Sequence, residues 1–241
     1  MHTHTTQTKQ VGIFPCRGWV APCQRASGSI KNCCFDVNAA ETLRGFKNLL
    51  GDTRVSTFST DVRRNGRPQT VMILQETICA GCGLRMPARK TTTTSRGYYN
   101  VSDECWDLYT EVLGTEYSNA FLFGQVHQLT VDSYAVQHAG GPHPDKSVDV
   151  HLFGLYLGLQ KGIRSPYIPP LLQRIVAAIE VWPHYEPPTE RAALTVFDVA
   201  FCDSTEDHIG VVKDWAQAVW ESWSKYHAEV ARVVSHSLKM E

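Results

Sequence analysis

The sequence has no long apolar run, and this absence limits the classes of protein it can encode. No stretch approaches the roughly 18–20 consecutive apolar residues that a membrane span needs. The first ten residues, MHTHTTQTKQ, also lack the apolar core of a secretory signal. Hydrophobic residues make up 43 % of the 241, enough for one large domain or two small ones with a core. We therefore expect a globular, cytoplasmic protein with no membrane partner.

Acidic residues are scarce in the first part of the chain. Residues 1–100 contain 14 Lys and Arg against 5 Asp and Glu, whereas residues 101–241 contain 9 against 19. Such a split indicates two segments of different origin or role. The basic segment could bind nucleic acid, or it could be a solvated basic surface. Only RRNGR (63–67) is a cluster, and aromatic residues are not interleaved with it. The composition therefore disfavours a nucleic-acid partner without excluding one.

The common catalytic signatures are missing as well. The sequence contains no nucleophile elbow, P-loop, HExxH helix or dinucleotide-binding fingerprint. It has eight cysteines, and without a secretory signal structural disulfides are not expected. Metal ligation and free thiols are the two interpretations that remain for them.

The pattern of residues along the chain changes at Cys79. Residues 1–35 have no hydrophobic period and are predicted to be a loop or tail, while residues 38–51 have the capping and apolar pattern of a short helix. Residues 54–76 indicate two strands joined by a hairpin at Asn65-Gly66. We expect residues 1–76 to form a basic extension, either a small α/β piece or partly disordered. A helical metal-binding domain is expected over residues 77–241.

Beyond Cys79 the apolar spacing is helical almost to the end. Ser102, followed by two acidic residues, predicts the start of a helix that runs to Leu113. Further helices are predicted over 118–138, over 148–162 with Ser147 as the cap, over 168–182 and over 206–239. The stretch LTVFDVAF (194–201) is predicted to be a short strand or a buried turn. The predicted fold class is mainly α, a helical bundle with a zinc-knuckle-like loop at its start.

The sharpest local pattern is Cys79-x-x-Cys82, followed by glycine. Two thiolates at this spacing form a turn from which both sulfurs can reach one tetrahedral ion. A closed zinc site needs two more ligands, and the sequence has no second CxxC. Cys105 is the nearest candidate, and the fourth ligand would be His127 or His138. Zinc is the expected cofactor, with another transition metal as an alternative; free thiols on a loop are the competing interpretation.

Helical spacing limits how the histidines can act. His127 and His138 are eleven residues apart and share a helix face, but roughly 16 Å separates them, so at most one joins the cysteines. A hairpin through residues 140–147 would bring His151 beside His138, where imidazoles from two helices could bind metal or exchange protons. Tyr134 lies on the same stripe, whereas Asp132 points elsewhere on the helical wheel. The candidate catalytic residues of this stretch are Asp132, Tyr134, His138 and His151.

Two further histidines are assigned structural roles. His143 lies in GGPHP, which is typical of a turn. Trp220, Trp223 and His227 share one face of the last predicted helix, and that face must be buried. His227 is therefore expected to enter the core with the two indoles.

The order of motifs CAGCG, HQLTVDSYAVQH, HLFGLYLGLQKG and WAQAVWESWSKYH resembles an uncharacterised bacterial family, a domain of unknown function. The likeness covers about residues 79–234, while the first 76 residues have no counterpart and would be a fused module or an extension from an early start codon. The resemblance implies a soluble helical domain with a zinc knuckle and no assigned reaction. The positions on its motifs are Cys79, Cys82, Cys105, His127, Asp132, Tyr134, Gln137, His138 and Trp220.

Three hypotheses for function follow. The first is a metal-binding protein with a His/Asp/Tyr pocket, an enzyme acting on a small molecule through metal or acid–base chemistry. The second is a zinc-stabilised binding module for nucleic acid or a protein partner. The third is a structural bundle whose histidines are hydrogen-bonded core groups. Metal content per chain separates the first from the others.

Overall fold

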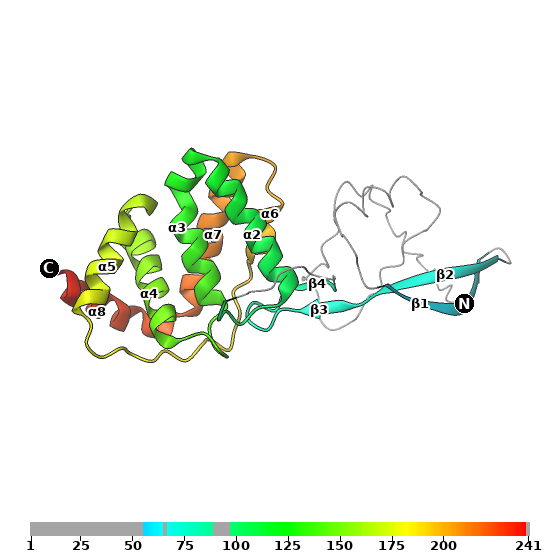
Figure 1. Cartoon of the computed structure of the whole chain (residues 1–241), viewed down its shortest axis with the longest axis horizontal. Helices are drawn as coiled ribbons and strands as arrows, with labels where there is room; N and C mark the ends of the chain where they lie inside the picture. The colour runs from blue at the N-terminus through cyan, green and yellow to red at the C-terminus, as the bar shows by residue number, and fades with distance from the viewer. Residues whose placement is uncertain (1–54, 65–66, 89–96, 240–241) are drawn as a thin grey trace, which may run out of the picture. The chain divides into compact units, whose positions relative to one another are not determined.

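The computed structural model of the chain describes residues 55–64, 67–88 and 97–239. The predicted tail (1–35) and the predicted helix (38–51) lie outside these residues. Within them the chain is mainly helical, as the sequence predicts, and Figure 1 shows the helices gathered side by side. No described helix is both long enough and apolar enough to cross a membrane.

Two antiparallel hairpins precede the helices. Strands β1 (Val55–Arg64) and β2 (Arg67–Leu74) pair from Val55 with Leu74 to Arg64 with Arg67, which confirms the hairpin predicted at Asn65-Gly66. The strands β3 (Glu76–Ile78) and β4 (Arg85–Pro87) form a second, three-residue pairing. The loop that joins β3 to β4 carries the CxxC motif.

The helical part begins with two long helices in direct succession. Ser102 caps α2 (Asp103–Ser118) by accepting a hydrogen bond from the backbone N–H of Cys105, which confirms the predicted start. The helix extends five residues beyond the predicted end. Asn119 then caps α3 (Ala120–Gln137), its side chain accepting from the amides of residues 121 and 122.

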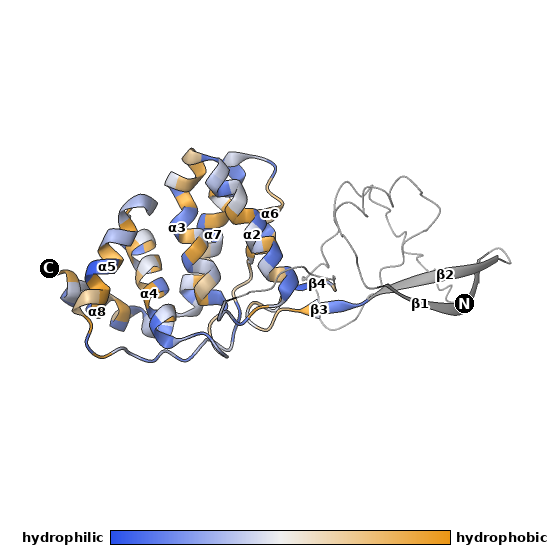
Figure 2. Ribbon diagram, viewed as in Figure 1, coloured by the Kyte–Doolittle hydropathy of each residue, from blue (hydrophilic) through white to orange (hydrophobic). Residues whose placement is uncertain are grey.

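Helix α3 is the centre of the bundle. It contacts α2, α4 (Asp145–Leu155) and α7 (Thr205–Ser222), and α5 (Ile168–Ala178) packs against α4 and α8 (His227–Leu238). Hydrophobic positions recur along α3, α5 and α7 (Figure 2). The core includes Tyr134, Leu152, Phe153, Trp215 and Trp220, each at most 2 % exposed. Because α3 has neighbours on several sides, its polar side chains are buried as well.

Helix α4 departs from its predicted form at both ends. It begins at Asp145 rather than after Ser147, with Pro144 in extended conformation before it and no side-chain cap. Ser147 therefore lies in the first turn of the helix, where its hydroxyl is available for other contacts. At the other end the helix continues into a π-helical turn, Tyr156–Gln160.

The stretch 194–201 is a helix, not the predicted strand or buried turn. The Thr195 side chain accepts from the amide of Phe197, and the Asp198 carboxylate accepts from the amide of Thr195 at 2.8 Å. This reciprocal capping box starts α6 (Val196–Ala200). The Thr-x-x-Asp signal is in the sequence, but the apolar residues around it favoured a strand.

The prediction of one continuous helix over 206–239 is also wrong, because the chain forms two helices there. Helix α7 ends at Ser222, a 3-10 turn follows over Ser224–Tyr226, and α8 begins at His227. The His227 Nε2 bonds to the Trp220 carbonyl at 2.9 Å, and the two rings stack with centroids 3.8 Å apart. His227 is half-buried at this break, rather than part of a continuous face with the indoles.

Candidate functional site

Three cysteines and one histidine from separate elements meet beneath the β3–β4 loop. Cys79 and Cys82 lie on that loop, Cys105 lies in the first turn of α2, and His138 caps the end of α3. Their four ligand atoms all lie within 4.8 Å of one another, and each residue is at most 5 % exposed. Among the described residues this is the one group of three or more such side chains placed to hold an ion.

The distances within the cluster match a tetrahedral zinc site. The Sγ atoms of Cys82 and Cys105 are 3.9 Å apart, and Cys105 Sγ is 3.5 Å from His138 Nε2. Zinc–sulfur bonds of about 2.3 Å and zinc–nitrogen bonds of about 2.0 Å at tetrahedral angles place sulfurs roughly 3.8 Å apart, and sulfur and nitrogen roughly 3.5 Å apart. The four side chains can therefore hold zinc with little movement.

Glycines shape the loop that carries the first two ligands. The turn closes through hydrogen bonds from the Gly83 amide to the Cys79 carbonyl and from the Cys79 amide to the Leu84 carbonyl, both 2.9 Å. Gly83 has a φ of +78°, a conformation that favours glycine. A Cβ on Gly81 would stand 2.7 Å from the Asn100 carbonyl oxygen and 2.9 Å from the His138 Cα, so no side chain fits there.

The partners of His138 present one ring nitrogen to the sulfurs. Its Nδ1 lies 2.6 Å from the Tyr134 carbonyl, which can only accept, so Nδ1 carries a proton and Nε2 is the nitrogen left to bind a metal. The Tyr134 hydroxyl donates to Cys105 Sγ at 3.6 Å, and the Tyr134 ring stacks on Tyr109. Such contacts behind the ligands fix their orientation, as is usual around bound metals.

The acid–base properties of the cluster suit a cation. Hydrogen bonds from the Cys105 and Cys82 thiols lower the pKa of Cys79, whereas the same contacts and burial raise the pKa of Cys105. Burial alone would lower the pKa of His138, but hydrogen bonds with Cys79 and Cys82 raise it to about 9. Metal binding requires deprotonated thiols and a neutral imidazole, so an ion such as zinc would displace the protons that these groups hold.

His127, the other predicted candidate for the fourth ligand, lies in a different polar centre. Its Nδ1 bonds to Oε2 of the buried Glu116 at 2.7 Å. Oε1 of Glu116 accepts from Thr130 and is 3.0 Å from His208 Nε2. These contacts satisfy both carboxylate oxygens, and hydrogen bonds with His127 and His208 lower the pKa of Glu116 against the effect of burial. The centre joins α2, α3 and α7.

Asp132 and His151 form a second pair, between α3 and α4. The His151 Nδ1 is 2.8 Å from Oδ1 of Asp132, which also accepts from Gln128 at 2.8 Å. The carboxylate fits because residue 154 is glycine, where a Cβ would be 2.0 Å from Oδ2. Burial raises the pKa of Asp132, while the hydrogen bond from His151 counteracts it. His151 faces Asp132 rather than His138, which the predicted hairpin would have brought beside it.

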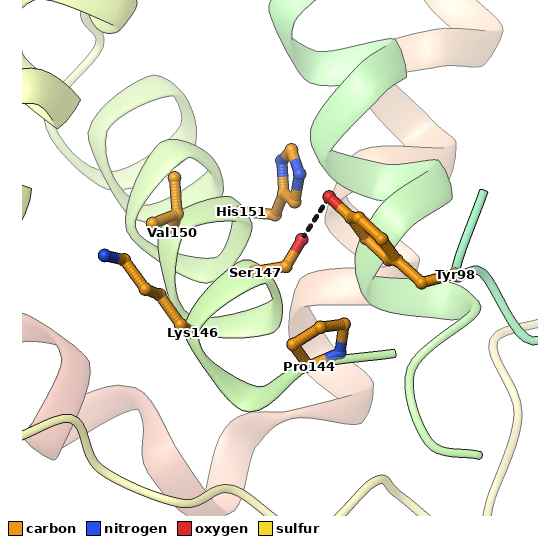
Figure 3. Close-up of a pocket in the computed structure, with 6 residues that line it drawn as sticks. All are labelled: Tyr98, Pro144, Lys146, Ser147, Val150 and His151. Atoms are coloured by element: carbon orange, nitrogen blue, oxygen red, sulfur yellow. Dashed lines mark hydrogen bonds between the residues drawn. The ribbon is translucent and has the colours of Figure 1, made fainter. Parts of the chain in front are cut away.

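His151 also lines an open pocket of about 390 Å³ at the start of α4. Figure 3 shows the His151 ring above Ser147, with the Tyr98 ring beside both. The remaining lining residues are Pro144, Lys146 and Val150. The pocket therefore combines an imidazole, two hydroxyls and apolar surface.

The Ser147 hydroxyl is hydrogen-bonded to a second histidine. Its Oγ is 2.9 Å from His143 Nε2 and 3.3 Å from the Tyr98 hydroxyl. The Nδ1 of His143 bonds to the His138 carbonyl at 3.1 Å. Burial lowers the pKa of His143 to about 4, so the ring is neutral at pH 7. The turn assigned to His143 is real, but its ring has a defined partner at each nitrogen.

The predicted site is thus divided in two. Tyr134 and His138 join the cysteines, whereas His151 lines the pocket and the buried Asp132 bonds to it from the interior. Gln137 belongs to neither, since it bridges the Leu194 carbonyl and the Trp215 indole. Sequence reasoning missed Glu116, His208 and Ser147. For Ser147 the sequence did contain a signal, because His143, Ser147 and His151 are spaced four residues apart.

The chain folds as a helical domain with a buried cluster of three cysteines and a histidine that could hold a metal ion. The chain belongs to the family of unknown function DUF5946, which it matches over residues 77–224. This confirms the resemblance to a domain of unknown function. Neither the curated proteins nor the solved structures contain a match to the chain.

Proposed function

We propose that the protein binds one zinc ion through Cys79, Cys82, Cys105 and His138, and that this ion is structural. The observation that carries the proposal is the convergence of four buried ligand atoms at zinc-like separations. Four protein ligands complete a tetrahedral shell and leave no position for substrate or water, as in structural sites. Three thiolates with one imidazole favour zinc over harder cations.

The ion would fasten the β3–β4 loop to the bundle. The loop places Leu84 and Met86, 8 % and 4 % exposed, against the core, but its strands are only three residues long. Pairing of that length is weak by itself. A zinc ion held by the loop, α2 and α3 would supply the missing constraint. The proposal includes a reducing compartment such as the cytoplasm, where three thiols stay free to bind metal.

Elemental analysis tests this proposal. The purified protein is expected to contain about one zinc per chain, and Cys105→Ser less than a fifth of that. Cys202→Ser is the matched control, because Cys202 lies outside the cluster and is expected to leave zinc content unchanged. Full zinc content in Cys105→Ser, or no zinc in the wild type after metal is supplied during folding, would refute the proposal.

A second function is favoured by the Asp132–His151 pair. We infer that the pocket performs acid–base chemistry on a small molecule, separately from the metal. Asp132 holds the Nδ1 of His151 at 2.8 Å, so that the Nε2 is the nitrogen left for the pocket. A histidine oriented by a buried carboxylate is a common general base. Tyr98 and Ser147 supply polar contacts for a ligand.

An activated ester tests the pocket, because imidazole bases accelerate its hydrolysis. Turnover of p-nitrophenyl acetate by the wild type is expected to fall at least tenfold in His151→Gln and in Asp132→Asn. Substitution of an exposed histidine, His184→Gln, serves as the control. Equal turnover by all four proteins would refute acid–base chemistry in this pocket.

The alternative function, a zinc-stabilised binding module for nucleic acid or protein, stays a prediction based on the basic first hundred residues. It predicts a shift of DNA or RNA in a gel that weakens steeply with added salt.

A further inference from the structure

His143, Ser147 and His151 follow one another at four-residue spacing. His143 lies in the turn before α4, whereas Ser147 and His151 lie on one side of the helix. His151 and Ser147 line the same pocket, and His143 bonds to Ser147 from beneath it. Figure 3 shows the Ser147 hydroxyl pointing between His151 and Tyr98.

The contacts of His143 define the direction of its hydrogen bond to Ser147. The His138 carbonyl, 3.1 Å from Nδ1, can only accept, so Nδ1 carries the proton. Nε2 is then the acceptor, and the Ser147 hydroxyl lies 2.9 Å from it and 3.3 Å from the Tyr98 hydroxyl, to which it can also donate. A serine, a histidine and an acceptor behind the histidine make up the arrangement that activates nucleophilic serines. A backbone carbonyl takes the place of the usual carboxylate.

We propose that Ser147 is a nucleophile, with His143 as its base, and that the pocket hydrolyses small carboxylic esters. The proposal rests on the second proposed function, since it uses the same pocket. Ser147 Oγ attacks the carbonyl carbon while its proton passes to His143 Nε2. The bond to the leaving alkoxide then breaks, and His143 returns the proton to the alkoxide. An acyl ester of Ser147 remains.

Water completes the cycle. A water molecule gives a proton to His143 and attacks the acyl carbon, the bond between that carbon and Ser147 Oγ breaks, and the proton returns to Oγ. The products are a carboxylic acid and an alcohol.

The pocket favours a short acyl group. Its volume of about 390 Å³ is near the lower end of ligand sites. Pro144 and Val150 give it apolar surface, whereas His151, Tyr98 and Lys146 contribute polar atoms. His151 is the second imidazole of the pocket. Its Nε2, the nitrogen that Asp132 does not hold, can hydrogen-bond the carbonyl or the leaving oxygen of the ester.

Covalent labelling tests the proposal without requiring the natural substrate. A fluorophosphonate reagent reacts with activated serines and is followed by intact mass and peptide mapping. The wild type is expected to gain one adduct, located on Ser147, and Ser147→Ala none. His143→Gln is expected to slow labelling at least tenfold. Ser222→Ala, on α7, is the control, because its hydroxyl bonds to the Val219 carbonyl and it should label like the wild type.

Turnover of p-nitrophenyl acetate separates this proposal from the one on which it rests. A loss of more than about 100-fold in Ser147→Ala, together with the adduct, supports a serine nucleophile. If Ser147→Ala keeps its turnover and no adduct forms, while His151→Gln is inactive, the nucleophile is refuted and acid–base chemistry by His151 stands. If none of the variants differs from the wild type, both proposals are overturned.

Discussion

Adding one methyl group at Gly154 should destabilise the protein, although alanine normally favours a helix. Gly154 lies in α4 directly against the buried Asp132. An alanine Cβ at this position would stand 2.0 Å from Asp132 Oδ2 and 2.6 Å from its Cγ. Neither atom belongs to the free end of a long side chain, so the carboxyl group must shift. That shift would strain its hydrogen bonds to His151 and Gln128.

The expected size follows from three contributions. Overpacking a core by one methyl group costs about 1–3 kcal/mol. Weakening the bonds of a buried carboxyl group adds about 1.5–3 kcal/mol. Replacing glycine by alanine within a helix recovers about 1 kcal/mol. The free energy of unfolding should therefore fall by about 1.5–5 kcal/mol, which lowers the melting temperature of a domain of this size by roughly 3–20 °C.

The control is a glycine with room around it. Gly114 is exposed in α2, and its Cβ would meet nothing within 4 Å. Gly114→Ala should raise the free energy of unfolding by about 0.5–1 kcal/mol, so the two substitutions should have opposite signs. Urea unfolding followed by circular dichroism measures both. A Gly154→Ala variant as stable as the wild type would show that the carboxyl group is not packed as described.

Three more predictions concern the other buried polar groups. Gly81→Ala should lower zinc content at least severalfold by elemental analysis, because its Cβ meets the backbone beside His138; unchanged zinc would contradict the close approach of the loop. Glu116→Ala should lower the free energy of unfolding by about 3–5 kcal/mol in urea, because it leaves two buried imidazoles without their acceptor; a loss below 1 kcal/mol would show that the network adds little. Burial raises the pKa of Asp149 to about 7. The protonated carboxyl group therefore contributes fully to stability below about pH 4, and this contribution is lost as the pH rises towards 7. Asp149→Asn should therefore stabilise the protein relative to the wild type at pH 8 more than at pH 5, and equal differences at both would refute that sign.

Local signals in the sequence were sufficient for much of the fold. The pairing of β1 with β2 and the Ser102 cap involve residues close together in the sequence, so the sequence determines them. The break between α7 and α8 could not be predicted in this way. It accompanies a stack between Trp220 and His227 that competes with a continuous helix, and helical periodicity is similar in both cases.

In the candidate site, too, local sequence signals indicated one part and packing decided the other. Cys79-x-x-Cys82 indicated half of a metal centre, because two sulfurs on one turn are a local arrangement. The choice of His138 over His127 depended on how α2 and α3 cross, and that is decided by packing. His127 is hydrogen-bonded to Glu116, away from the sulfurs, whereas His138 at the end of α3 contacts Cys105.

The sequence by itself determined which chemical groups the protein has and where α2 begins. Tertiary structure alone decided that Asp132 and His151 form a pair and that Ser147 faces a pocket, because both depend on the approach of α4 to α3. Helical spacing relates residues within one helix. The relation between two helices is determined by the shapes of the side chains between them, here the space left at Gly154.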